Sequence, residues 1–272
     1  HNSDRTMFDS KAHPDHSSDG LVAHELAHQW FGDMITTRNW ANIWLNEGFA
    51  TFFSRLYLTK DRGNDEGDYI RLGEIRSFKR ADKNKRRPTV DFVYDEPFEL
   101  FSSHVYAKGS LILTMLRDVI GEEGFWRSIR NYTNENKLKN VETSDLKKII
   151  EMTTGQNLDW FFKQWLYEPG FPNYDVSWNY NQRKKELSIH VKQTQDLKTT
   201  SLFKMPIKII VDSGEKKEHV IWVDNLDSVY KIKSDKRPKM VIFNSGQRVP
   251  SNLKMQKSVA DLKYQLQNAS NA

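Results

Sequence analysis

Two histidines and two glutamates are the residues whose types and spacing could do chemistry. His24 and His28 are four positions apart, Glu25 directly follows the first histidine, and Glu47 follows the second after eighteen intervening residues. On an α-helix, residues four apart lie on one face one turn apart, so both imidazoles can reach one point in space. Glu25 lies about 100° round that helix, so it can touch something bound between the histidines without ligating it.

Two imidazoles and one carboxylate are the protein ligands of a catalytic zinc site, whose fourth position stays open to water. The sequence has no cysteines, so this set is its one obvious metal-binding option. We therefore predict one zinc ion per chain held by His24, His28 and Glu47, with Glu25 as the general base of a zinc peptidase. The competing interpretation is a pair of surface histidines, but the apolar side chains within residues 21–31 favour an enclosed site.

Three short motifs resemble a known family. HELAHQWFG at residues 24–32, WLNEGFA at residues 44–50 and YAKG at residues 106–109 are similar to the signatures of the zinc aminopeptidases that include alanyl aminopeptidase (aminopeptidase N) and the leukotriene hydrolase. This gluzincin group has the pattern HExxH, eighteen residues, then glutamate. The resemblance covers roughly residues 5–170. It implies a thermolysin-like fold, release of N-terminal amino acids from peptides, and Tyr106 as a donor to the oxyanion of the tetrahedral intermediate.

One family feature is missing from the sequence. The family binds the free amino terminus of its substrate partly through a glutamate in a GxMEN segment, and this chain starts at His1, after the place where that segment would lie. The exopeptidase activity is thus implied by the resemblance, whereas peptide hydrolysis is supported by residues that are present. We expect a fragment whose parent chain adds an N-terminal domain and a helical C-terminal domain.

The hydrophobic pattern predicts an α+β protein with three parts. Helical periodicity runs through residues 1–170, the predicted thermolysin-like zinc metallopeptidase catalytic domain. Short alternating segments separated by turns predict a small β-sandwich over residues 171–250; five strands are expected, beginning with ELSIHVKQT. An apolar stripe then predicts that residues 251–272 start a helical C-terminal region. This order matches the resembled family, in which a β-sandwich precedes a helical domain.

Several elements of the catalytic domain have predicted roles. The zinc histidines are expected on a helix from Asp19 to about Phe31, ended by Gly32. The helix of Glu47 begins near residue 46, and Thr51, one turn later, is a candidate support for a zinc imidazole. Trp40 and Trp44 are interpreted as packing residues, as is the stripe formed by Val105, Gly109, Ile112, Leu116 and Ile120.

Charge and composition exclude some partners. The net charge is +5, and the densest basic run, at residues 79–87, lacks the interleaved aromatics that stack on nucleic-acid bases, so we interpret it as a solvated helix end. No run of 18 apolar residues exists, so no membrane span is predicted. The HPDH motif at residues 13–16 is interpreted as a surface loop. Cysteine usage and the opening HNSDRTMFDS leave cytoplasm, periplasm and secretion open.

Three other functions remain open on the sequence. A thermolysin-like zinc endopeptidase has the same HExxH chemistry and needs no anchor for a substrate amine. A non-catalytic scaffold could keep the fold after losing the site, although His24, Glu25, His28, Glu47 and Tyr106 are all intact. A carbohydrate- or protein-binding module on the β-sandwich is disfavoured because its strands show no cluster of exposed aromatics. A peptide remains the expected substrate.

Overall fold

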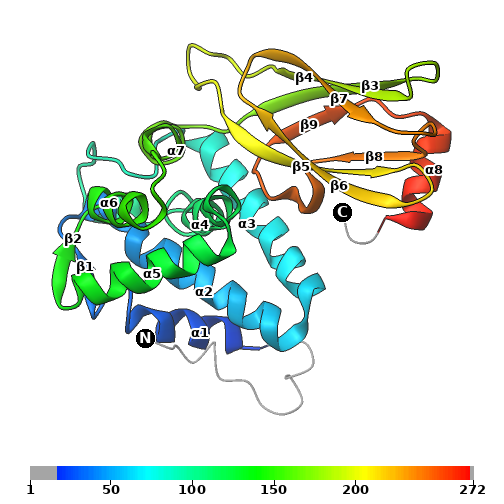
Figure 1. The fold of residues 1–272 in the computed structure, drawn as a ribbon. Helices are drawn as coiled ribbons and strands as arrows, with labels where there is room; N and C mark the ends of the chain where they lie inside the picture. The colour runs from blue at the N-terminus through cyan, green and yellow to red at the C-terminus, as the bar shows by residue number, and fades with distance from the viewer. Residues whose placement is uncertain (1–16, 270–272) are drawn as a thin grey trace. The chain divides into compact units, whose positions relative to one another are not determined.

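The computed structural model describes residues 17–269, and Figure 1 shows a helical part followed by a strand-rich part. The chain divides into two compact units between Glu168 and Pro169. This combination of helices and strands confirms the predicted α+β class.

The HPDH motif lies outside the described residues. Within residues 17–269, every helix is too short or too polar to cross a bilayer.

The first unit is built from helices joined by short connections, with one small parallel pair of strands. Helix α1 carries both paired histidines in its second half, and α2 carries Glu47 near its start. The elements are α1 (Asp19–His28), β1 (Ile35–Thr37), η2 (Trp40–Asn42), α2 (Trp44–Arg62), α3 (Asn64–Asn84), η3 (Pro97–Leu100), α4 (Ala107–Ile120), α5 (Glu122–Asn136), β2 (Lys139–Val141), α6 (Thr143–Thr154), α7 (Asp159–Phe162) and the π-helical turn η4 (Lys163–Tyr167). Strands β1 and β2 pair in parallel.

Helix α4 is the centre of this unit. The predicted apolar stripe is buried. All the remaining residues from 107 to 116 are buried as well. A helix that is buried on every side lies in the interior of its domain. It packs against α2, α3 and α5. The side chain of Trp44, at the start of α2, is fully buried, as expected of a packing residue. Trp40 is 47% exposed, with its ring 5.9 Å from that of Phe101, so its packing role is only partial.

The predicted solvated basic run is partly wrong. Arg87 is 6% exposed because its guanidinium pairs with Asp91 at 2.8 Å and donates to the carbonyl of Glu99. Arg86, beside it, donates to the buried carboxylate of Asp82 at 3.0 Å. Ion pairs and a hydrogen bond from this run therefore connect the end of α3 to the following loop. A count of charges in the sequence cannot tell such paired residues from solvated ones.

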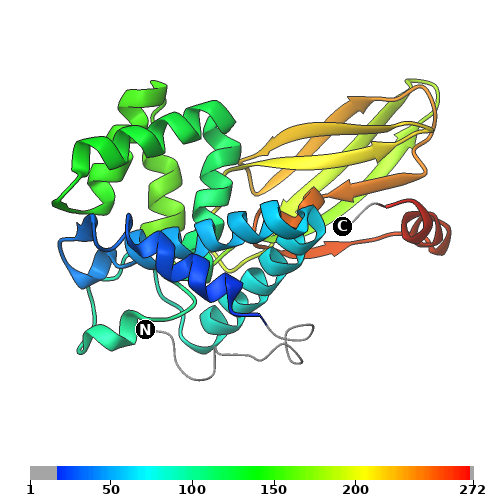
Figure 2. The ribbon, with the colours of Figure 1, turned by 90° about the horizontal axis from the view of Figure 1, so that it is seen from below.

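The second unit consists of two sheets and a terminal helix. Its elements are β3 (Asn173–Asn181), β4 (Glu186–Gln193), β5 (Met205–Asp212), β6 (Lys216–Val223), β7 (Asp227–Lys233), β8 (Met240–Phe243), η5 (Ser245–Gln247), β9 (Asn252–Met255) and α8 (Val259–Asn268). One sheet has the order β7-β4-β3-β9 and the other β6-β5-β8. Figures 1 and 2 show the two sheets stacked, and the ring of Tyr174 on β3 lies 5.3 Å from that of Phe243 on β8.

Two strands differ from the sequence prediction. Strand β3 precedes the first predicted strand and pairs with both β4 and β9. The expected helical start at residue 251 is wrong, because Asn252–Met255 forms β9 and pairs in parallel with β3. A free sheet edge offers backbone donors and acceptors to any extended segment beside it, so this short polar stretch becomes a strand. Helix α8 begins only at Val259, after Ser258 caps it.

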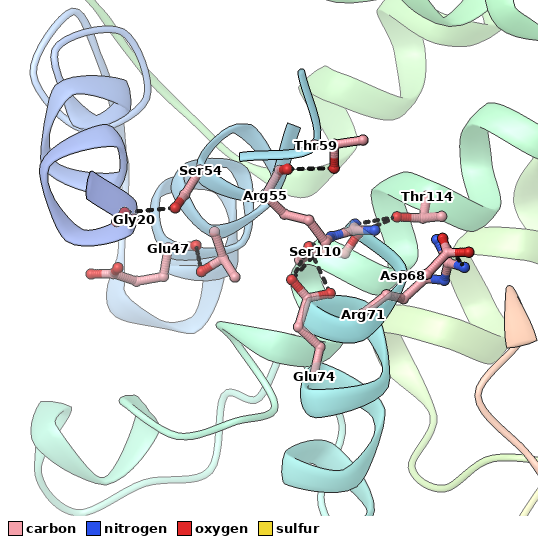
Figure 3. Close-up of polar contacts among 11 residues, drawn as sticks. Gly20, Glu47, Ser54, Arg55, Thr59, Asp68, Arg71, Glu74, Ser110 and Thr114 are labelled. Atoms are coloured by element: carbon pink, nitrogen blue, oxygen red, sulfur yellow. Dashed lines mark hydrogen bonds and ion pairs between the residues drawn. The ribbon is translucent and has the colours of Figure 1, made fainter. Parts of the chain in front are cut away.

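A buried polar network ties three helices of the first unit together (Figure 3). The guanidinium of Arg55 on α2 pairs with the carboxylate of Glu74 on α3 at 3.1 Å. It also donates to the hydroxyls of Ser110 and Thr114 on α4, at 3.1 and 2.6 Å, and Ser110 in turn donates to Glu74. Burial raises the pKa of the Glu74 carboxyl, and the charge of Arg55 opposes that rise. The network is therefore sensitive to losing either charged partner.

Replacing Arg55 with methionine tests this dependence. The Arg55→Met variant leaves the Glu74 carboxylate buried without its main counter-charge, which costs about 3–5 kcal/mol of unfolding free energy. Urea unfolding followed by the helical circular dichroism signal measures this loss. Adding Glu74→Leu should recover most of it. The control is Arg127→Met, which removes a solvent-exposed ion pair with Glu123 and an exposed hydrogen bond to the carbonyl of Thr153, and should cost about 1 kcal/mol or less. Equal losses for both single variants would contradict the buried-pair account.

Candidate metal centre

Helices α1 and α2 pack closely enough to bring the paired histidines against Glu47. The hydroxyl of Ser54 on α2 donates to the carbonyl of Gly20 on α1 at 2.6 Å (Figure 3). A Cβ at Gly20 would lie 3.2 Å from the methyl group of Leu58, so the two helices are nearly in contact there. His24 lies one turn after Gly20, on the side of α1 that faces α2.

Three ligand-type atoms meet in a small triangle. The Nε2 atoms of His24 and His28 are 3.1 Å apart, and each lies 3.3 Å from Oε2 of Glu47. Tetrahedral zinc, with bonds of about 2.0–2.2 Å, separates its ligand atoms by roughly 3.3–3.6 Å. The triangle is thus close to the size that such an ion imposes, and its donor set of two nitrogens and one oxygen suits zinc. Among residues 17–269, this group is a candidate for holding a metal ion.

The backbone after α1 fixes the state of one imidazole. Nδ1 of His28 lies 3.0 Å from the carbonyl oxygen of Phe31. A carbonyl can only accept, so Nδ1 carries a proton. In the neutral imidazole Nε2 then keeps its lone pair for the triangle, and in the protonated imidazole Nε2 donates to Glu47. This contact needs the chain to turn directly after His28. Helix α1 accordingly ends at His28 rather than near Phe31, and Gly32, at φ 154°, leaves no Cβ to collide with the His28 ring.

The charges of the triangle support one another. Burial by itself would raise the pKa of the Glu47 carboxyl, but hydrogen bonds with His24 and His28 outweigh it and lower that pKa to about 2. The hydrogen bond with Glu47 raises the pKa of His28, against the opposing effect of burial. Glu47 is therefore an anion across the neutral pH range, and one that already faces two imidazole nitrogens.

Glu25 and Tyr106 lie beside the triangle. The phenol ring of Tyr106 stacks on that of His24 with centroids 6.1 Å apart. Burial, and then the neighbouring charge of Glu47, raise the pKa of the Tyr106 phenol above its ordinary value of 10. Glu25 directly follows His24 on α1, so its side chain leaves the helix next to the triangle. The structure therefore brings His24, His28 and Glu47 together with Tyr106, and Glu25 adjoins them in sequence on α1.

Two residues near the site have contacts that the sequence did not predict. Thr51 supports no imidazole; its hydroxyl donates to the carbonyl of Glu47, one turn back on the same helix, at 2.7 Å. Lys108, two residues after Tyr106, is fully buried with its ammonium 5.2 Å from the ring centre of Phe78, and burial lowers its pKa to about 8. The Phe31 carbonyl is a contributor that sequence reasoning missed, since Gly32 signalled only a helix end.

Comparisons with known proteins identify the family to which the sequence is related. A model of the "Peptidase family M1 domain" matches residues 3–165. "Probable aminopeptidase 1" of Sulfurisphaera tokodaii is 36% identical over 160 residues, which are 57% of this chain and 20% of that protein. "Tricorn protease-interacting factor F2" of Thermoplasma volcanium is 31% identical over 216 residues, 75% of this chain and 27% of that protein. The chain spans about a fifth to a quarter of the length of these curated relatives.

A solved structure shows the same fold. Aminopeptidase A of Legionella pneumophila, in complex with aspartic acid, superposes with a TM-score of 0.78 at 23% sequence identity. The match covers 93% of this chain and 28% of that one. At this identity the likeness establishes the architecture, and it extends over both compact units.

Titration of the metal-free protein tests the contact between His28 and Glu47. We expect the pKa of His28 to lie above 6.5, and Glu47→Gln to return it toward 6.5, because an amide offers the imidazolium no charge. Nuclear magnetic resonance of the ring protons measures both values, with His28→Gln to assign the signal. An unchanged pKa in Glu47→Gln would contradict the contact.

The same shifts give a stability profile for the metal-free protein. The contribution of His28 is fully present below pH 6.5 and is lost as the pH rises through its raised pKa. The contribution of Glu47 is present above pH 4.5 and is lost as the pH falls toward about 2. The pair should therefore stabilise most between pH 4.5 and 6.5, and Glu47→Gln should flatten this window in urea unfolding measurements.

Proposed function

Because the chain belongs to peptidase family M1, we propose that it carries the catalytic site of a zinc aminopeptidase, an enzyme that releases N-terminal amino acids from peptides. The observation that carries this proposal is the convergence of two imidazole nitrogens and one carboxylate oxygen within 3.1–3.3 Å. Relatives named as aminopeptidases add support. The proposal covers the whole protein to which the chain corresponds, with a peptide as substrate.

We propose that His24, His28 and Glu47 hold one zinc ion per chain. The residues fit, since the nitrogen and oxygen donors suit zinc and one imidazole already has its free lone pair directed at the triangle. When bound, zinc lowers the pKa of coordinated water toward 7 and polarises a carbonyl. With three protein ligands, a fourth position is left for chemistry.

Glu25 is proposed as the general base and acid. It directly follows His24 on α1, about 100° round the helix, so its carboxylate can reach the space beside the triangle without joining it. There a carboxylate oxygen accepts the proton of the attacking water and passes it to the nitrogen of the leaving amine, which breaks the peptide bond.

Tyr106 is proposed as the donor to the oxyanion. Its hydroxyl is a neutral donor throughout the working pH range, because burial and Glu47 raise the pKa of the phenol. Stacking against His24 holds the ring at the edge of the triangle, where a developing negative charge on the former carbonyl oxygen needs a hydrogen bond. The hydrogen bond from the Tyr106 hydroxyl becomes stronger as negative charge develops on that oxygen.

We further propose that the helical unit is a thermolysin-like catalytic domain spanning residues 1–170. The pairing of α1 and α2, which presents HExxH and the distant glutamate to one point, supports that arrangement. The β-sandwich is proposed for residues 171–250 together with β9, and the helical C-terminal region then begins at Val259. Relatives several times longer than this chain support an N-terminal domain and a C-terminal domain in the parent chain.

Comparing free and blocked substrates tests the aminopeptidase proposal. The zinc-loaded complete protein should hydrolyse an aminoacyl dipeptide with a free amino group, and N-acetylation of the same dipeptide should lower kcat/KM at least about 100-fold, because a buried amine contact worth about 2.7 kcal/mol is lost. Equal rates on both would establish an endopeptidase instead. Zinc binding with neither substrate hydrolysed would point to a scaffold.

Glu25→Gln separates metal binding from proton transfer. The amide keeps the shape of the side chain but cannot take a proton, so kcat should fall by about 10²–10⁴-fold while the variant retains one zinc by elemental analysis. Glu123→Gln, which alters a largely exposed carboxylate on α5, is the control and should leave kcat unchanged. A zinc-loaded Glu25→Gln variant with near-normal kcat would remove the proposed mechanism.

A further inference from the structure

Helices α2 and α4 touch through their backbones at two glycines. A Cβ built on Gly109 would lie 2.8 Å from the Cα of Gly48, and a Cβ on Gly48 would lie 2.9 Å from the Cα of Gly109. A Cβ on Gly48 would also lie 3.1 Å from the carbonyl oxygen of Val105. These neighbours are backbone atoms, which cannot swing aside as a flexible side chain can. Any larger residue at either position must therefore push the two helices apart.

The usual reason for a glycine is absent at both positions. Gly48 and Gly109 lie inside helices and neither has a positive φ, so no unusual backbone conformation calls for glycine. Glycine in a helix interior is among the least favourable residues, while alanine is the most favourable. Both positions require a residue without a side chain, because only then can α2 and α4 approach one another so closely.

The contact lies directly between two parts of the site. Glu47 immediately precedes Gly48 on α2, and Tyr106 stands three residues before Gly109, at the start of α4. The three ligand-type residues all come from α1 and α2, whereas Tyr106 is brought to them by α4 alone. The separation of α2 and α4 thus determines how far the phenol lies from the triangle, without altering the triangle itself.

The buried network of Arg55 fixes the position of α4 along the length of α2. Arg55 follows Gly48 by seven residues, two turns along α2, and it donates to Ser110 and Thr114 on α4 (Figure 3). The glycine contact limits how closely the helices approach, and these hydrogen bonds limit how far one helix slides along the other. Together, the two contacts allow α4 a single position relative to α2.

We propose that the Gly48–Gly109 contact, held in register by Arg55, is a positioning device that sets the distance of the Tyr106 hydroxyl from the metal ligands. The proposal rests on the proposed function and adds residues that touch neither metal nor substrate. Relieving a Cβ contact from 2.8 Å to the ordinary 3.4–4 Å requires a displacement of 0.6–1.2 Å. A misplacement of about 1 Å at a reacting group costs roughly 10²-fold in rate.

A double-mutant cycle with Tyr106→Phe tests the proposal on the zinc-loaded complete protein. Gly109→Ala should lower kcat by roughly 10²-fold with KM and zinc affinity, measured by chelator competition, within about threefold of wild type. In the Tyr106→Phe background, Gly109→Ala should lower kcat by less than about threefold, because the hydroxyl that it displaces is already gone. Gly73→Ala, at a helical glycine of α3 with nothing within 4 Å of its added Cβ, is the matched control and should leave kcat unchanged.

Four results would overturn the positioning role: a kcat of Gly109→Ala within threefold of wild type, an equal loss in both backgrounds, a loss of zinc, or an unchanged Tyr106–Glu47 distance in its crystal structure. That distance is expected to grow by 0.6–1.2 Å and needs no activity for its reading. A wild-type protein that hydrolyses no peptide would refute the proposed function alone, and the crystal structure would still decide the inference.

A gentler variant serves if Gly109→Ala does not fold. Thr114→Val has nearly the same shape and removes the 2.6 Å hydrogen bond from Arg55, so it loosens the register without a steric clash. It should lower kcat about tenfold, which corresponds to about 1.4 kcal/mol of activation free energy, and should do so only when Tyr106 is present. An unchanged kcat, or the same loss with Tyr106→Phe, would overturn the proposal.

Discussion

The packing of helix α2 against its neighbours is the constraint on which the site depends. On one side, α2 approaches α1 closely enough for Glu47 to lie 3.3 Å from both imidazoles. On another side it touches α4 backbone to backbone, and through Arg55 it reaches α3. These contacts are short because small residues or hydrogen-bonded groups occupy them. A helix held from three directions cannot shift toward one neighbour without straining the others, so the positions of its side chains are well defined.

This packing also explains how the structure tolerates its buried charges. The Arg55–Glu74 pair is satisfied by two hydroxyls from α4, and Glu47 is satisfied by two imidazoles from α1. In each case a charge on one helix is matched by polar groups on another, so separating the helices would leave a charge unpaired in a poorly solvated interior. The same groups that would make the site reactive therefore also oppose its opening.

The sequence predicted the parts of this arrangement that local geometry determines. Residues four apart on a helix must share a face, so the pairing of His24 and His28 follows from spacing alone. The approach of Tyr106 does not, because it depends on how α4 crosses α2, and only the family resemblance suggested it. Strand β9 escaped prediction for a similar reason: its four residues have little strand character of their own, and the free edge of β3 decides their conformation. Contacts distant in sequence are the part that local patterns leave undetermined.

The residues of the site are divided between helices, with the triangle on α1 and α2 and Tyr106 at the start of α4. The two helices that carry the proposed metal ligands, α1 and α2, are fixed to one another by the Ser54–Gly20 hydrogen bond and by close packing near Leu58. The tyrosine arrives on a separate helix, whose position depends on a different set of contacts. With the roles proposed for Tyr106 and the triangle, substitutions between α2 and α4 should alter the stabilisation of a transition state while the affinity for zinc stays the same. Substitutions between α1 and α2 would change both together, because the metal ligands would move relative to one another and to every other group.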